Sequence, residues 1–568
     1  MVKKAFRNAL LIQIIAGIVG VIGMVVDGAI TGSCLGTEAM AAFGLASPVV
    51  MLFVACSSVC ELGTSLLIGR LIGARKTGEA SDALSSCIAF AVSLSLIITV
   101  LVFVFSNEIA ALLGASGNIA NMTSDYLRGF SLCAPALFLM TVLMPVLQID
   151  GMMKKVVFAV ITMTLVNITG DILVGFVFNG GLFEMALATT ISYFAALMLM
   201  LPKLVKKGET LHLTFKHVKF EYVRSMIYGG LPNALQQGCR SLLLLMLNTR
   251  LLAIADANAV AAFTAIMSAA NLCMVIGSGI GTDVSMLTGV FVGDADDRAI
   301  RKLVRTALFT AVVYDAVLCV VLILCAGIIM PMFISDPVII TLATRGFRLY
   351  CLSMIGYSIN VTLRLYYQAM RLFRLAYIYV FCNSFLFTTI GAFLLSELIE
   401  VNGIWLAFLF GETVTLIMLA VWTLIKTPRG SSFIDRLMFI PPEMTKDVMA
   451  RFDSVAENEI SMSAISEQVY AFCIDNGGEK STADLLSHSV GEIGKCFLKN
   501  NAGRGEQVEI RLLRKNTGWS MNIRDNGSSF NPLNVLGDNS YFDSASVLKE
   551  GKIEYLDTLN INSINIEI

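Results

Sequence analysis

Apolar runs long enough to cross a lipid bilayer recur along most of this chain of 568 residues. A helix needs about 20 apolar residues to span the hydrocarbon core, and about twelve such runs lie between Leu10 and Ile425. Hydrophobic residues make up 56% of the chain and charged residues only 15%, which excludes an ordinary water-soluble globule. The sequence therefore predicts an all-α membrane protein with about twelve transmembrane helices.

The charges in the loops predict how the chain is oriented. Basic residues sit at the N-terminus and in every second loop, whereas the intervening loops carry mostly Asp and Glu. Loops rich in Lys and Arg stay on the cytoplasmic side. We therefore expect a multi-pass protein of the plasma membrane with both termini in the cytoplasm. The basic residues behind this prediction include Lys3, Lys4, Arg7, Arg70, Arg75, Lys76, Lys154, Lys155, Arg298, Arg301, Lys302, Arg305, Arg371, Arg374 and Lys426.

An internal repeat divides the apolar region into two halves. Residues 70–75 resemble residues 290–295, and residues 147–149 resemble residues 367–369, at a shift of roughly 220 residues. Each half holds about six runs, and an even number returns the chain to the side on which it started. We predict two parallel six-helix repeats, residues 1–205 and 206–430, with a central cavity between them.

The chain changes character after Pro428. Residues 440–568 are polar and have mixed periodicity, which predicts an α+β cytosolic domain of ordinary size. Strands that alternate apolar and polar residues around a turn favour a hairpin. We expect strands at 460–462, 508–515, 519–524, 553–555 and 561–568, and helices at 465–476 and 482–501.

Two carboxylates, Asp27 and Asp171, lie inside apolar runs of the first half. A carboxylate in hydrocarbon is costly, so an intramembrane acid is by default a candidate functional site. Asn167 lies four residues before Asp171 and shares its helix face. Two carboxylates and an amide can bind Na⁺ through hard oxygens or can share protons. This pattern predicts a cation-coupled transport site; the alternative is that each acid ends a helix among lipid headgroups.

The second half lacks these acids at the repeat-equivalent positions. Asn248 stands opposite Asp27, and Ala392 stands opposite Asp171. Because a packing requirement would recur in both repeats, the asymmetry favours a functional site in the first half. We expect Arg240 to pair with an acid or to face the cavity. The other intramembrane polar residues, whose roles the sequence leaves open, are Glu61, Asp150, Asp283, Asp315, Arg364 and Glu412.

Cysteine and histidine supply no further site. The 13 Cys are scattered singly and the three His are far apart, so the sequence predicts neither a disulfide framework nor a metal site beyond the transported cation. No cofactor is expected in the membrane part, and no nucleic acid is expected as a partner. The predicted contacts are a small organic substrate, the lipid bilayer and a cytosolic regulatory protein.

Residues 1–430 resemble the MATE (multidrug and toxic compound extrusion) family of antiporters. In that family the acid of the first span and the Asn and Asp of the fifth form a cation site, which a Thr of the sixth span joins. The resemblance implies these roles for Asp27, Asn167, Asp171 and Thr189. Some members carry a Glu in the seventh span where this chain has Arg240, so no cation site is expected in the second half. The similar stretches are residues 26–32, 35–39, 73–80, 167–171 and 185–189.

Residues 455–568 resemble the GHKL ATPase fold in its anti-sigma-factor serine kinase form. The resemblance is carried by residues 523–532, in which Asp525 and Gly527 match positions that contact adenine, and by Glu492, which matches a catalytic base. Cys496 replaces the Asn that holds Mg²⁺, and residues 540–551 lack the glycine-rich lid. Three readings stay open: a regulatory domain that binds ATP and Mg²⁺, a degenerate interaction module, and an active serine kinase.

Three functions therefore compete. The first is a secondary antiporter, not an enzyme, that exchanges Na⁺ or H⁺ for drug-like or metabolite substrates and, as the MATE resemblance implies, works as a monomer. The second is a flippase for lipid-linked precursors from the same superfamily, which needs a strongly basic cavity. The third is a membrane sensor derived from a transporter that signals through its cytosolic domain. The acid pair favours transport, and the appended domain favours regulation.

Overall fold

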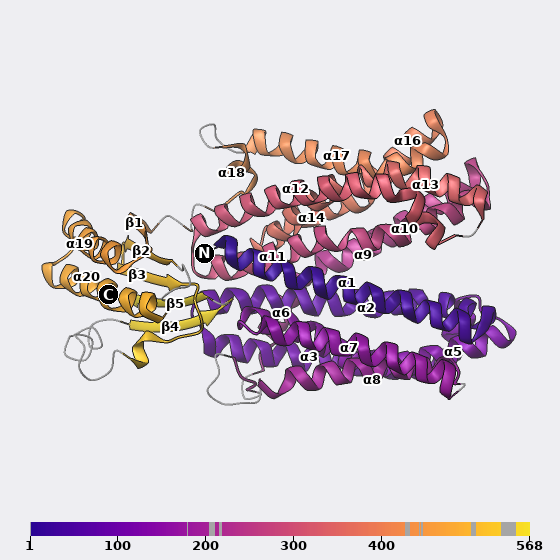
Figure 1. The fold of residues 1–568 in the computed structure, drawn as a ribbon, viewed down its shortest axis with the longest axis horizontal. Coiled ribbons are helices and arrows are strands. Elements are labelled where there is room, and N and C mark those ends of the chain that lie inside the picture. Colours follow the sequence, from indigo (N-terminus) through magenta and orange to yellow (C-terminus); the bar gives the residue numbers. More distant parts are fainter. Residues whose placement is uncertain are drawn as a thin grey trace.

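The computed structural model describes most of the chain as a long helical body with a small sheet domain at one end (Figure 1). The N-terminus lies near the sheet domain, and the C-terminus lies within it (Figure 1). The residues described are 2–178, 180–203, 211–214, 218–334, 336–426, 432–441, 444, 447–500, 507–535, 552–559 and 561–568.

The first half of the helical body, up to residue 203, contains six long elements, some of them bent or extended by short helices. Its fifth long element ends in a π-helical segment, η1, a feature that is frequent at functional sites. The elements are α1 (Val2–Cys34), α2 (Gly36–Gly73), α3 (Thr77–Val104), α4 (Ser106–Leu112), α5 (Gly117–Ser131), α6 (Ala134–Ile149), α7 (Met153–Ile172), η1 (Leu173–Val177), α8 (Leu182–Met200) and η2 (Leu201–Lys203).

The second half repeats this pattern of elements. Thr77 and Asp297, which begin α3 and α12, and Met153 and Phe373, which begin α7 and α15, are separated by roughly 220 residues. The elements are α9 (Phe220–Ile254), α10 (Ala257–Cys273), α11 (Val275–Gly293), α12 (Asp297–Ile329), η4 (Met330–Met332), α13 (Pro337–Cys351), α14 (Met354–Ala369), α15 (Phe373–Phe381), η5 (Cys382–Leu386), α16 (Phe387–Ile399) and α17 (Val401–Lys426). The short α18 (Phe433–Leu437) follows.

Fewer helices meet the length and apolarity of a membrane span in the described part of the chain than the twelve that the sequence predicted. Among the described residues, 8 helices are long and apolar enough to cross a membrane, or up to 10 if each of two bent pairs counts as one span. The bent pairs are α5 with α6, at 46°, and α13 with α14, at 48°. The long helices α1 and α9 are not among them. Twelve transmembrane helices are therefore not confirmed, and the division at residue 205 stays a prediction.

The two halves touch closely at the end of the body that carries the sheet, which we call the domain end. A Cβ built on Gly73 would lie 2.0 Å from the carbonyl oxygen of Val290, and one built on Gly293 would lie 2.2 Å from that of Arg70. Only glycine permits backbones to approach this closely. The repeat found in the sequence therefore places its two matching glycines against each other.

The C-terminal residues form a five-stranded antiparallel sheet in the order β1-β2-β3-β5-β4, with two helices on one face. Buried residues of both helices, such as Val469 and Leu486, pack against Ile510, Met521 and Ile564 of the sheet. The elements are β1 (Val448–Ala456), α19 (Glu459–Asp475), α20 (Lys480–Asn500), β2 (Val508–Lys515), β3 (Gly518–Asp525), η7 (Pro532–Asn534), β4 (Lys552–Thr558) and β5 (Ile561–Glu567).

The predicted strand at 460–462 is wrong, because these residues form the first turn of α19. The side chain of Asn458 caps this helix by accepting a hydrogen bond from the backbone N–H of Ser461. Met462 is buried whereas Ile460 is 83% exposed, and the buried positions continue at helical spacing along α19. The strand of this region precedes the helix instead, as β1.

Candidate functional site

Asp27 of α1 and Asp171 of α7 come together inside the first half. Their carboxyl groups are hydrogen-bonded to each other. Two carboxyl groups this close repel each other when both are ionised, so the site favours a bound proton or cation. Asp27 Oδ1 and Asp171 Oδ2, the remaining oxygens, are buried and have no hydrogen-bond partner among the described residues. The pair thus offers two unsatisfied acceptors in a place that water does not reach.

Asn167 and Thr189 extend this pair toward α8. The Asn167 amide donates to Thr189 Oγ1 over 3.3 Å, and the Thr189 hydroxyl donates to the carbonyl oxygen of Met185 over 3.4 Å. Asn167 is 7% exposed, and its Oδ1 lies 3.8 Å from where a Cβ on Gly23 of α1 would stand. The four predicted residues therefore lie on three packed helices, α1, α7 and α8. These helices correspond to the first, fifth and sixth predicted spans.

Aromatic hydroxyls border the site. Tyr126 of α5 and Tyr193 of α8 both interact electrostatically with Asp27, and Tyr126 also interacts with Asp171. Neither tyrosine was predicted, because nothing in the sequence ties these rings to an acid far away in the chain. Two carboxyls, an amide and the hydroxyls of one threonine and two tyrosines provide oxygen ligands for a hard cation and sites for a proton.

A second polar cluster lies buried in the second half, around Glu412 of α17. Its carboxylate accepts hydrogen bonds from the amides of Asn360 on α14, at 2.5 Å, and Asn383 on η5, at 2.8 Å. The hydroxyl of Tyr379 donates to Asn360 Oδ1. The sequence singled out Glu412 but missed its partners; an Asn in an apolar run was the available signal. Because amide donors surround this carboxylate, the cluster is satisfied without a cation.

We expect Glu412→Ala to destabilise the protein by about 2–4 kcal/mol, because both amides would lose their buried acceptor. Glu412→Gln, which keeps an acceptor oxygen, should cost less. Thermal unfolding of the detergent-solubilised protein measures both. Glu397→Ala is the matched control, because that exposed acid of the second half pairs with Arg250 at the surface and is worth at most about 1 kcal/mol. Equal midpoints for Glu412→Ala and Glu397→Ala would contradict a structural role for the cluster.

The intramembrane arginines do not pair with acids within the described part of the chain. We expected Arg240 to pair with an acid or to face the cavity. In the structure its Nη2 donates to the amide oxygen of Asn271, Oδ1, over 2.9 Å. Arg364 is 4% exposed and donates to Asn233 Oδ1 over 3.2 Å. Amide oxygens accept well from guanidinium donors, which is why no acid is needed.

One further acid lies where the two halves meet. Asp283 of α11 is fully buried, and its carboxyl group interacts with the side chain of Gln13, which belongs to α1 of the first half. Four residues earlier, a Cβ on Gly279 would stand 3.3 Å from the Cβ of Gln13. This polar contact therefore joins the two halves in the interior.

In the sheet domain, two of the three candidate nucleotide residues, Asp525 and Gly527, are hydrogen-bonded to each other. Asp525 is fully buried, and its Oδ2 accepts hydrogen bonds from the backbone N–H of Gly527 and from the amide of Asn562, both at 3.1 Å. Glu492 Oε2 is buried without a partner among the described residues. The predicted lid, residues 540–551, lies outside the described residues. The amide of Asn562 and the backbone of Gly527 thus share one oxygen of Asp525 as their acceptor.

Comparison with known proteins extends these observations. The model of the MatE family matches residues 13–173 and 232–394. The multidrug export protein MepA of Staphylococcus haemolyticus (strain JCSC1435) is 26% identical over 454 residues, which cover 78% of this chain and 97% of that protein. MepA of Staphylococcus aureus (strain NCTC 8325 / PS 47) is 26% identical over 218 residues, or 38% of this chain. The match spans about half of that relative, 48% of its length.

Solved structures show the same fold. A multidrug resistance MATE family transporter of the MOP superfamily in an outward-facing conformation has a TM-score of 0.71 at 21% identity, over 77% of this chain and 96% of that chain. A crystal structure of MATE in complex with MaL6 has a TM-score of 0.71 at 21% identity, over 77% and 97%. The family match ends at residue 394, so it does not reach the sheet domain.

Proposed function

The chain belongs to the MATE family of membrane-embedded multidrug efflux transporters, and from that premise we propose that it exchanges H⁺ or Na⁺ for drug-like or metabolite substrates by alternating access. The observation that carries this proposal is the buried pair of Asp27 and Asp171, hydrogen-bonded to each other in the first half. An intramembrane carboxyl pair is expensive to keep, and binding a cation or a proton offsets that cost.

Coupling follows from the geometry of the pair. When Asp27 and Asp171 hold a cation or share a proton, α1 and α7 can pack closely; when both are ionised, their repulsion favours a different arrangement. Exchange requires only that the cation and the substrate favour opposite states of the transporter, which takes about 1–3 kcal/mol of coupling. Beside the pair, the bond from Asn167 to Thr189 joins α7 to α8.

We take H⁺ as the first coupling ion to test, because one of two neighbouring buried carboxyls readily holds a proton. Na⁺ stays the alternative, since two ionised carboxylates that face each other also suit a hard cation. In proteoliposomes, an imposed pH gradient should therefore drive dye movement, and nigericin, which collapses that gradient, should stop it. Dye movement that follows a Na⁺ gradient at constant pH would make Na⁺ the ion, and movement that follows neither gradient would reject cation coupling.

For the sheet domain we propose a role as a degenerate interaction module rather than as a nucleotide-binding domain or an active kinase. Asn562 donates to Asp525 Oδ2, and Cys496 stands where the related fold uses an Asn to hold Mg²⁺. Calorimetric titration of the full-length protein with ATP and Mg²⁺ should give no binding heat. Saturable binding would restore the nucleotide-binding reading and, with it, Glu492, Asp525 and Gly527 as its residues.

The two alternatives stay as proposals of lower rank. A lipid-linked precursor flippase needs free basic side chains in the cavity, but Arg240 and Arg364 are bound to Asn271 and Asn233. A sensor that signals through the sheet domain would give no function to the costly pair of Asp27 and Asp171. The plasma-membrane location, the cytoplasmic termini, the monomeric state and a separate cytosolic regulatory partner belong to the proposal as well.

A further inference from the structure

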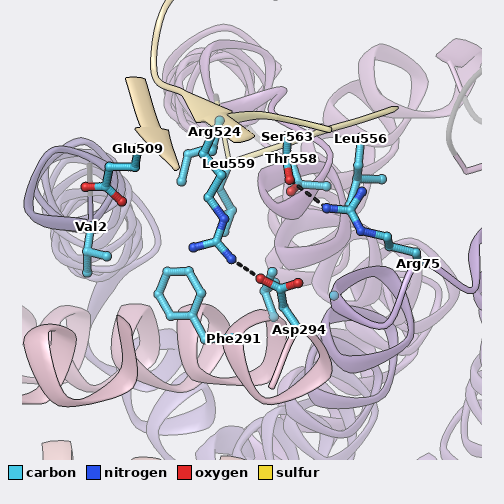
Figure 2. A pocket seen from close by; sticks show the side chains of 13 residues that line it. Val2, Arg75, Phe291, Asp294, Glu509, Arg524, Leu556, Thr558, Leu559 and Ser563 are labelled. Atoms are coloured by element: carbon cyan, nitrogen blue, oxygen red, sulfur yellow. Dashed lines mark hydrogen bonds and ion pairs between the residues drawn. The ribbon is translucent and has the colours of Figure 1, made fainter. Parts of the chain in front are cut away.

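The sheet domain is seated on the helical body by the polar face of its sheet. Arginines from three adjacent strands reach the loop between α11 and α12 in the second half: Arg451 of β1, Arg511 of β2 and Arg524 of β3. Arg524 Nη1 lies 2.7 Å from Asp296 Oδ2 and Arg451 Nη1 lies 2.7 Å from Asp297 Oδ1. Arg511 lies 3.2 Å from Asp294 and 2.9 Å from Asp296. Arg524 also pairs with Asp294 (Figure 2).

These pairs are sheltered from water. The side chains of Arg524 and Asp296 are 11% and 5% exposed. Burial lowers the pKa of Arg524 to about 10, so its guanidinium still carries a charge at neutral pH. Charge pairs with little solvent around them are screened weakly, and losing one partner is costly because the other is left buried and unpaired.

The same face also binds the first half. Arg75, which follows α2, donates to Ser563 Oγ of β5 over 2.6 Å (Figure 2). The backbone N–H of Leu559 donates to the carbonyl oxygen of Ile149, the last residue of α6, over 2.9 Å. Lys4 of α1 donates to the carbonyl oxygen of Asn526 over 3.2 Å. Apolar contacts accompany these bonds, because Leu556, Leu559 and Ile561 belong to the same buried cluster as Val2 and Phe291.

The contacts to the two halves form one continuous network through the sheet. Arg524 and Ser563 are direct partners in the pairing of β3 with β5. Ser563 donates to Asn522 Oδ1 over 3.1 Å, and Arg524 Nε donates to the same oxygen over 3.2 Å. The chain of bonds therefore runs from Arg75 through Ser563, Asn522 and Arg524 to Asp296, with no flexible linker in between.

The loops joined in this way are the two matching loops of the repeat. Arg75 and Ala295 both have a left-handed backbone, with φ of 59° and 50°. Gly73 and Gly293, two residues before them, form the close contact between the halves. In alternating access by two repeats, one half rocks against the other, so these loops must separate when the transporter opens at the domain end.

We propose that the sheet domain is a clamp that holds the two halves closed at the domain end and must let go of one half before the transporter opens there. This inference rests on the proposed alternating-access function and adds a regulator to it. The clamp favours the state open at the opposite end. A signal that loosens the domain would raise the fraction of transporters able to load substrate from the domain end.

Hydrogen–deuterium exchange of the full-length protein in nanodiscs tests the clamp without requiring transport. Arg75→Ala cuts the network on the side of the first half. It should speed backbone exchange at residues 70–76 and 290–297 by about tenfold, because a charged hydrogen bond that favours closure is lost. Lys76→Ala is the matched control, since this neighbour is exposed and pairs only locally with Glu79 at 3.0 Å.

A second variant protects the test against misfolding. Ser563→Ala removes the same link from the side of the domain and should speed exchange at the same two loops while α19 and α20 keep wild-type exchange. Unchanged exchange at 70–76 and 290–297 in both variants would overturn the clamp. Faster exchange confined to residues 552–567 would overturn it too, because the domain would then let go while the halves stay closed. Loss of cation-dependent export in the wild type would instead refute the proposed function.

Discussion

Asp171→Asn should abolish cation-driven export while leaving the protein folded. The amide can still donate a hydrogen bond to Asp27, so the packing of α7 against α1 survives, but the pair no longer exchanges a proton or ligates a cation with two carboxylates. Removing the coupling should lower gradient-driven dye transport by roughly 5- to 150-fold, the range of a coupling of 1–3 kcal/mol. Dye transport in proteoliposomes under an imposed pH gradient measures the loss.

The matched control for Asp171→Asn is Asp125→Asn. Asp125 is an exposed acid of the first half whose carboxylate lies 3.7 Å from Arg128 on the same helix, so its loss removes one charge without touching the pair. We expect wild-type transport from the control and a thermal midpoint within a few degrees of wild type from both variants. If Asp171→Asn transports as fast as Asp125→Asn, the carboxyl pair is not the coupling site.

The sequence predicted the elements of the fold better than their contacts. Periodicity and turn residues placed the hairpin at 508–515 and 519–524, and the structure has β2 and β3 over Val508–Lys515 and Gly518–Asp525. The strand at 460–462 failed because the alternating pattern of Ile460, Ser461 and Met462 is too short to distinguish a strand from the first turn of a helix. The cap at Asn458 decided between them, and cap geometry is visible only in three dimensions.

The candidate site shows the same division. A costly acid in an apolar run is visible in one sequence, so Asp27 and Asp171 were predicted, and helical spacing added Asn167. The partners of Glu412 were not predicted, because Asn360 and Asn383 come from two other elements and pairing between helices leaves no local trace. The clamp was out of reach for the same reason: Arg524 and Asp296 meet only through the tertiary fold.

Gly73→Val should disrupt closure at the domain end. A Cβ at Gly73 would stand 2.0 Å from the carbonyl oxygen of Val290, and that backbone atom cannot swing aside as a flexible side chain could. Forcing a larger residue into a close contact typically costs about 1–3 kcal/mol. Here the halves can relieve the overlap by parting, so the cost should fall on the closed state.

We therefore expect Gly73→Val to speed hydrogen exchange at residues 286–293 and to reduce gradient-driven dye export. A transporter that cannot close at one end cannot complete the alternation between its two states. Gly78→Val is the matched control: it makes the same substitution on the first turn of α3, where nothing lies within 4 Å of the new Cβ. Equal exchange and equal export in the two variants would mean that the halves do not close on Gly73. That result would also remove the contact on which the clamp acts, since Arg75 holds the sheet domain only two residues further on.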